Sequence, residues 1–205
     1  MEEEYLQKVS VACSDGRVDA KKILQMTHKT MGEMLSDRGY QPKSLCSDVN
    51  DMLLAIIRTS PVFFGTKRGG ANVHVYYDKE LRTTVKTARS LIQETNGDSV
   101  IVVSILGPTP YCSKDLSENR SISFYQMQRL VTNVTHHSLV PSHRLIDEEE
   151  EVALFKKYSL LRSQLPILLL EDPVCRYYDF PLNSIVEIRR NGIGHETSLY
   201  YRRVS

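Results

Sequence analysis

The apolar run Val100–Leu106, with the sequence VIVVSIL, constrains the fold more than any other feature of the chain. Its continuous β-branched character is typical of a strand buried inside a sheet that helices cover. A helical pattern over Glu80–Glu94 precedes the run, and the alternating segment NVHVYY precedes that helix. This order predicts an α/β fold for the N-terminal part of the chain. The run is also far too short to cross a membrane.

Two further amphipathic helices are predicted nearer the N-terminus. The first spans residues 19–39, where Asp19 can cap the helix and Gly39 is a natural stop. The second spans Asp48–Thr59, and Ser47 is expected to cap it. Both helices carry apolar residues at helical spacing, so both are expected to pack on a core.

The last third of the chain has the pattern of a smaller α+β domain. The acidic run Asp147–Glu151 lies where the N-terminus of a helix favours negative charge, and this helix is expected to reach about Arg162. Two strands, SIVEIRR and TSLYYRRV, are predicted after it, and NGIGH is expected to join them as a hairpin. Together these elements predict a small sheet with one long helix.

A domain boundary is expected within Thr132–His143, where the proline-punctuated segment HSLVPSH follows RLVTNVT. RLVTNVT itself is expected to be a strand. The chain is therefore divided into an α/β domain of residues 1–132 and an α+β domain of residues 133–205.

Bulk composition gives no sign of a particular partner. The formal net charge is +1, so contact with nucleic acid would have to come from local patches. The four cysteines lack the CxxC spacing of a zinc site, which favours free thiols in a reducing compartment. The acidic N-terminus also lacks the layout of a signal peptide.

Neither a catalytic site nor a metal or cofactor site is predicted. The chain lacks the G-x-S-x-G, P-loop, H-E-x-x-H and G-x-G-x-x-G motifs. A Mg²⁺-dependent nuclease needs clustered carboxylates, and although Asp78 and Glu80 are available, the next buried strand supplies no acid or lysine. The adjacent His136 and His137 are assigned to a solvated linker. We expect a protein that is not an enzyme by itself.

Three basic segments are candidates for sequence-independent contact with DNA. The glycines of GTKRGG, Gly65–Gly70, are expected to form a loop in which Lys67 and Arg68 approach a phosphate. The loop GPTPYCSKD, Gly107–Asp115, is expected to be rigid and exposed. A third candidate is a stripe on the helix, for which a solvated face is the favoured interpretation; its residues are Arg82, Lys86 and Arg89.

The C-terminal third resembles the fifth subunit of eukaryotic nuclear RNA polymerases and the short archaeal counterpart of that subunit. The resemblance rests on NVTHHSLVPSH, KYSLLRSQLP, DPVCRYYDF, IVEIRR and LYYRRV, which follow one another in the order and spacing of that family. SDRGY and VIVVSILGPTP extend it more thinly into the N-terminal part. The length and the divergence look most like the version encoded by large cytoplasmic DNA viruses, African swine fever virus in particular.

This resemblance implies a non-catalytic subunit of a multisubunit DNA-dependent RNA polymerase. The N-terminal domain would be a jaw with a nuclease-like fold but no nuclease activity, lying beside the downstream duplex DNA. The C-terminal domain would be an assembly module attached to the largest subunit. Implied locations are the host cytoplasm, its viral factory and the virion for a viral protein, and the nucleus for a cellular one. A free nuclease of the same N-terminal fold is the alternative, and a free-standing regulator would need a base-reading helix.

The resemblance also implies residues for both interfaces. For DNA these are Thr109, Pro110, Tyr111, Ser113 and Lys114, besides Lys67 and Arg68, although the lysine is displaced by one position from the family pattern. For the partner subunit they are Leu165, Pro166, Ile167, Leu169, Asp172, Pro173, Arg176 and Tyr177.

The run PILLL is expected to be extended, between a helix and a short helix that Asp172 caps. Alternation then directs Leu168 and Leu170 into the domain's own core, and Ile167 and Leu169 towards another polymerase subunit.

Overall fold

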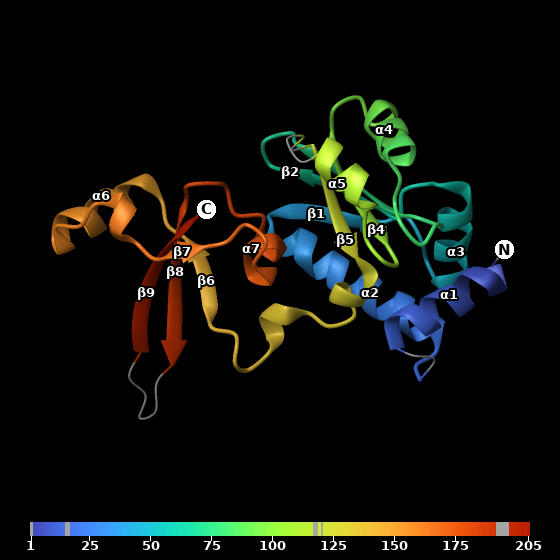
Figure 1. The fold of residues 1–205 in the computed structure, drawn as a ribbon, viewed down its shortest axis with the longest axis horizontal. Coiled ribbons are helices and arrows are strands. Elements are labelled where there is room, and N and C mark those ends of the chain that lie inside the picture. The colour runs from blue at the N-terminus through green and yellow to red at the C-terminus, as the bar shows by residue number, and fades with distance from the viewer. Residues whose placement is uncertain (1, 15–16, 117–118, 120, 192–196) are drawn as a thin grey trace. The chain divides into compact units, whose positions relative to one another are not determined.

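The computed structural model describes residues 2–14, 17–116, 119, 121–191 and 197–205. The chain divides into two compact units, Met1–Thr132 and Asn133–Ser205. Each unit combines helices with a β-sheet of its own (Figure 1). This mixed architecture with two sheets agrees with the helix-and-sheet class predicted from the sequence.

The first unit holds a five-stranded sheet in the order β1-β2-β3-β4-β5. The first three strands pair antiparallel, whereas β3, β4 and β5 run parallel. The elements are α1 (Glu2–Ser14), α2 (Ala20–Asp37), β1 (Tyr40–Ser44), α3 (Val49–Arg58), β2 (Phe63–Lys67), β3 (Asn72–Tyr77), α4 (Val85–Glu94), β4 (Ser99–Ser104), α5 (Pro110–Asp115), β5 (Ile122–Gln126) and the 3-10 helix η1 (Met127–Leu130).

The strand β4 lies at the centre of the parallel part of this sheet, as its sequence predicts. Val100 and Val102 pack with Ala88 and Leu91 of α4 and with Cys112 of α5. The alternate β4 residues are also buried and point to the opposite face. Figure 1 shows the sheet between α4 and α5 on one side and α1 and α2 on the other. Helix layers on both faces explain why an apolar run without alternation forms this strand.

Capping explains the bounds of α2 and α3. Asp19 caps α2 by accepting a hydrogen bond from the Lys21 amide at 3.2 Å, and the chain leaves the helix at Gly39 with φ +82°, as predicted. The cap of α3 is Asp48 rather than Ser47, so that prediction was wrong by one residue. The Asp48 carboxylate accepts from the Asp51 amide at 2.8 Å, because it stands three residues before that N–H.

The second unit holds a four-stranded sheet in the order β6-β8-β9-β7. Strands β8 and β9 pair antiparallel, as predicted, whereas the expected hairpin residues between them, 192–195, lie outside the described part of the chain. The elements are η2 (Val134–His136), β6 (Ser142–Leu145), α6 (Glu148–Tyr158), η3 (Arg162–Gln164), β7 (Ile167–Leu168), α7 (Pro173–Tyr178), β8 (Ile185–Asn191) and β9 (Thr197–Val204).

Helices cover both faces of this smaller sheet. On one face, Cys175 of α7 packs with Val186 and Ile188 of β8. On the other face, Leu154 of α6 packs with Ile185 and the partly buried Tyr201. Because side chains of a β-strand alternate between its two faces, β8 contributes to two small cores.

Helix α6 begins as predicted but ends earlier. Asp147 and Glu150 form a capping box, in which the Asp147 carboxylate accepts from the Glu150 amide at 2.8 Å and the Glu150 carboxylate accepts from the Asp147 amide at 3.2 Å. The helix ends at Tyr158 rather than near Arg162, because Ser159 adopts the left-handed conformation with φ 50°.

The expected strand RLVTNVT was wrong. Its residues contribute to η1 and η2, and the strand of this region is β5, upstream of it. Asn133 gives the physical reason, since its side-chain oxygen accepts hydrogen bonds from the Thr135 amide at 3.0 Å and hydroxyl at 2.7 Å. Such a turn at an asparagine replaces the extended backbone that a strand needs.

Adjacent leucines of α3 provide a test of this core. Leu53 is 2% exposed and Leu54 is 42% exposed. We expect Leu53→Ala to lower the free energy of unfolding by about 2–5 kcal/mol, and Leu54→Ala by less than about 1 kcal/mol. Urea unfolding followed by circular dichroism measures both. Equal losses in the two variants would contradict the buried face of α3.

Candidate functional site

The segment Thr109–Lys114, expected to be a loop, is a short helix, so that prediction was wrong. Thr109 caps α5 by accepting a hydrogen bond from the Cys112 amide at 3.2 Å, and Pro110 occupies the first turn. A capping threonine followed by proline is a standard helix start, because the ring fixes φ and the missing N–H would lack a partner there. The candidate DNA-contacting residues therefore lie on a helix with a defined orientation.

One side of α5 is fixed in the core and the other faces outward. Cys112 is fully buried, and its burial raises the pKa of the thiol. Tyr111 is 70% exposed, and Ser113 and Lys114 are also exposed. The outward side of α5 thus offers an aromatic ring, a hydroxyl and an ammonium group. These three groups can contact a sugar–phosphate backbone without reading bases.

The arginine stripe expected on one helix does not form, because α4 begins at Val85 rather than Glu80. Arg82 instead precedes the helix, and its guanidinium donates to the carbonyls of Leu106 and Pro108, each at 3.4 Å. Arg89 pairs with Asp115 at 2.8 Å. Both arginines therefore hold the segment around α5 in place. No local pattern predicts these contacts, since each joins residues more than twenty positions apart.

Lys67 and Arg68 lie at the tip of the β2–β3 hairpin. The expectation of a loop over Gly65–Gly70 was wrong in its first half, since β2 continues to Lys67. The ammonium of Lys67 lies 4.6 Å from the centroid of the Tyr40 ring, and Gly70 adopts φ +81° in the turn. Lys67 is exposed, so its charge lies at the surface while its ammonium group contacts the ring. Arg68 is exposed beside it.

The two groups of candidate DNA contacts lie at opposite ends of the sheet. The hairpin tip precedes β3, whereas α5 follows β4, and these two strands are parallel. Strand β3 has six residues, which corresponds to a separation of about 20 Å along the sheet. The structure does not bring Lys67 and Arg68 together with Thr109–Lys114.

The described residues hold no carboxylate cluster of the kind that a nuclease uses. Asp78 is buried after β3 and accepts a hydrogen bond from the Glu80 amide at 3.0 Å. Across the described ranges, no three His, Cys, Asp or Glu side chains are placed to hold a metal ion. In the same part of the chain, no helix is long and apolar enough to span a membrane.

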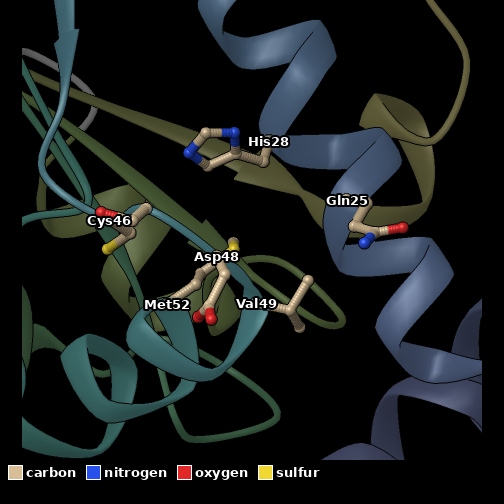
Figure 2. Close-up of a pocket in the computed structure, with 7 residues that line it drawn as sticks. Gln25, His28, Cys46, Asp48, Val49 and Met52 are labelled. Carbon is tan, nitrogen blue, oxygen red and sulfur yellow. The ribbon is translucent and has the colours of Figure 1, made fainter.

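A cavity of about 260 Å³ lies between α2 and the start of α3, and Figure 2 shows His28, Cys46 and Asp48 around it. The Nε2 atom of His28 lies 3.1 Å from the Ser44 hydroxyl, and burial lowers the pKa of the imidazole. Burial, and then the charge of nearby Asp51, raises the pKa of the Cys46 thiol. The raised pKa of this thiol disfavours the reactive thiolate.

The segment PILLL, residues 166–170 and called the leucine run below, follows the predicted alternation only as far as Leu169. Leu168 is buried in β7, whereas Ile167 and Leu169 are 49% and 63% exposed. Leu170, expected in the core, is 42% exposed, so that prediction was wrong. A turn gives the reason, since the Asp172 amide donates to the Leu169 carbonyl at 3.0 Å and ends the alternation of a strand.

The other residues predicted for the partner surface divide into buried and exposed ones. Leu165 is buried against Leu154, and the Tyr177 hydroxyl is buried and accepts from the Asn133 amide group at 3.0 Å. Asp172 caps α7 by accepting from the Val174 amide at 2.8 Å. These three residues therefore build the fold itself. Those left at or near the surface are Pro166, Ile167, Leu169, Pro173 and the half-buried Arg176.

Comparison with known protein families identifies a similarity in the second unit. Residues 132–204 match the family model described as RNA polymerase Rpb5, C-terminal domain. The match covers the second structural unit almost completely. This unit is therefore similar to a domain of an RNA polymerase subunit.

Particular relatives extend the similarity over most of the chain. This chain is 28% identical over 189 residues to "DNA-directed RNA polymerases I, II, and III subunit rpabc1" of Dictyostelium discoideum, and the alignment covers 84% of this chain and 91% of the relative. It is 26% identical over 193 residues to "DNA-directed RNA polymerase subunit 5-like protein 1" of Arabidopsis thaliana, covering 84% and 90%. The RPABC1 subunit of Caenorhabditis briggsae is 27% identical over 181 residues, covering 85% and 81%.

The cap of α5 can be tested separately from any DNA contact. We expect Thr109→Val to lower the free energy of unfolding by about 1 kcal/mol, because the Cys112 amide loses its acceptor. Thr109→Ser keeps the hydroxyl and should remain close to the unmodified chain. Urea unfolding of the isolated protein measures both variants, and an unchanged Thr109→Val would rule out the capping role.

Proposed function

We propose that this chain is a non-catalytic subunit of a multisubunit DNA-dependent RNA polymerase. The observation that carries the proposal is the match of residues 132–204 to the Rpb5 C-terminal domain, together with polymerase subunits that align over 84% of the chain. Residues 133–205 act as the assembly domain and dock on the largest subunit. Residues 1–132 form the jaw beside downstream duplex DNA, with a nuclease-like fold and no nuclease activity.

Exposed apolar side chains support docking through the second unit. Ile167, Leu169 and Leu170 are each more than two-fifths exposed, and Pro166 and Pro173 lie close to them in sequence. A continuous group of exposed apolar residues usually marks a surface that a partner covers. The backbone here is held in place, since the Leu170 amide donates to the Ser205 carbonyl at 3.0 Å. Little ordering entropy is then lost on binding.

The outward side of α5 supports contact with downstream DNA. Tyr111, Ser113 and Lys114 face outward from a helix fixed at its cap and its buried cysteine. Contacts of this kind neutralise phosphates and carry no sequence information. Lys67 and Arg68 provide a second, separate basic point at the other end of the sheet.

The comparisons give no support to the alternative of a free nuclease. For the origin of the chain, we propose a large cytoplasmic DNA virus, with the subunit in the viral factory and the virion. The relatives named above come from cellular organisms, and a cellular subunit of this kind would act in the nucleus.

Charging the apolar surface tests the docking proposal. We expect Leu169→Asp to reduce recovery of polymerase with the tagged chain by about tenfold or more, because an unpaired carboxylate buried against apolar groups is strongly destabilising. The control is Leu139→Asp, which charges a leucine of the same unit that is 83% exposed. Affinity purification and mass spectrometry measure recovery. Undiminished recovery with a folded Leu169→Asp variant would remove Leu169 from the interface.

Exchanging two residues of α5 tests the DNA proposal. Polymerase that contains Pro110→Ala with Lys114→Gln should bind downstream DNA more weakly, and the salt slope of binding should fall by about one. Lys29→Gln, at a lysine 79% exposed, is the control for loss of one charge. Filter binding at several salt concentrations and crosslinking of the subunit to DNA measure the effect. Unaltered crosslinking and slope would count against contact through α5.

A further inference from the structure

The outer side of strand β9 is only partly covered. β9 spans Thr197–Val204 and pairs with β8 along Thr197–Arg203. On its other side β7 pairs only with Arg203 and Val204. Among the described residues no other strand pairs with this side, so Thr197–Tyr201 form an open edge of the sheet (Figure 1).

The direction of the Arg203 amide shows which backbone groups face this edge. It donates to the Pro166 carbonyl at 2.9 Å, on the side where β7 lies. Successive residues of a strand direct their N–H and C=O groups to opposite sides. Thr197, Leu199 and Tyr201, at even steps from Arg203, therefore direct both groups towards the open side. These donors and acceptors have the spacing that another strand would need.

The residues of the edge carry none of the usual protection against pairing. Sheet edges in soluble proteins are commonly protected by lysine, proline or a bulge. The sequence of the edge is TSLYY, without a charge or a proline, and Leu199 and Tyr200 are each 47% exposed. An uncharged edge of this kind is suited to take up an extended segment.

Unneutralised arginines lie beside the edge and indicate the charge of its occupant. The guanidinium of Arg190 lies 4.8 Å from the centroid of the Tyr200 ring. Arg202 donates to the Ile167 carbonyl at 3.0 Å, so its charge lies towards the open side of β9. In the described part of the chain neither arginine pairs with a carboxylate, and the one glutamate of β8, Glu187, is buried and contacts other arginines. Carboxylates on an added strand would complement these charges.

We infer that Thr197–Tyr201 accept an extended acidic segment of the polymerase subunit on which this chain docks, as a strand added beside β9. The Leu199 and Tyr201 backbones hold the segment, and its Asp or Glu side chains reach Arg190 and Arg202. The source of the segment rests on the proposed function, whereas the open edge and the arginines beside it are properties of this chain alone.

A proline at the edge tests the added strand. In the tagged full chain, Leu199→Pro removes an outward N–H without removing a hydrogen bond to β8, and Leu199→Val is the matched control. We expect Leu199→Pro to lower polymerase recovery by about tenfold and Leu199→Val to leave it unchanged. Arg190→Glu should lower recovery further as salt is reduced, whereas Arg190→Gln should show a weaker dependence on salt.

Hydrogen exchange provides a second measurement on the unmodified chain. Amides within residues 197–201 should exchange about tenfold or more slowly in the polymerase complex than in the free chain. If circular dichroism shows that Leu199→Pro is unfolded, this comparison of exchange rates tests the added strand on its own. Tyr200 replaced by the photoreactive p-benzoylphenylalanine should crosslink to a segment that contains Asp or Glu.

The outcomes separate this inference from the proposed function. If the unmodified chain recovers no polymerase, the proposed function fails. If polymerase is recovered equally with Leu199→Pro and exchange within 197–201 is unchanged, the edge inference fails and the proposed function stands. A crosslink to a segment without acidic residues overturns the assigned chemistry. If amides within 197–201 already exchange slowly in the free chain and the chain sediments as a dimer, the occupant of the edge is a second copy of this chain, and the inference is overturned.

Discussion

The packing of β4 between two helix layers is the constraint on which the N-terminal unit depends. Because both faces of the strand are buried, its side chains are apolar or small. The basic residues considered for DNA contact lie outside this core. They lie on α5 at one end of the sheet and at the tip of the β2–β3 hairpin at the other, because β3 and β4 are parallel.

In the second unit an ion network joins three elements beside the two small apolar cores. Arg144 of β6 contacts Glu150 of α6 at 2.8 Å and Glu187 of β8 at 3.3 Å. Hydrogen bonding to Arg144 lowers the pKa of Glu150. Three elements are joined in this way, while apolar side chains of the leucine run stay exposed. Exposed apolar surface of this kind is available for a partner to bury.

Strong local signals in the sequence predicted much of this structure. Asp172-Pro173 predicted the start of α7 correctly, and the β-branched run predicted β4. The same cap-and-proline signal at Thr109-Pro110 marks the start of α5, where a loop was expected. Leu170 was misplaced because one turn ends the alternation. The separation of the two basic groups depends on strand order, which no local pattern contains.

Helix α5 is braced rather than merely positioned. Arg82 binds the carbonyls just before it, Arg89 pairs with Asp115 at its end, and Cys112 fixes it to the core. A force applied to its outer side chains would therefore pass into α4 and the sheet instead of bending the segment. Arg89 is 62% exposed, so salt screens this brace more than it affects the buried contacts. The stiffness of this end of the domain should therefore depend on ionic strength even where its stability does not.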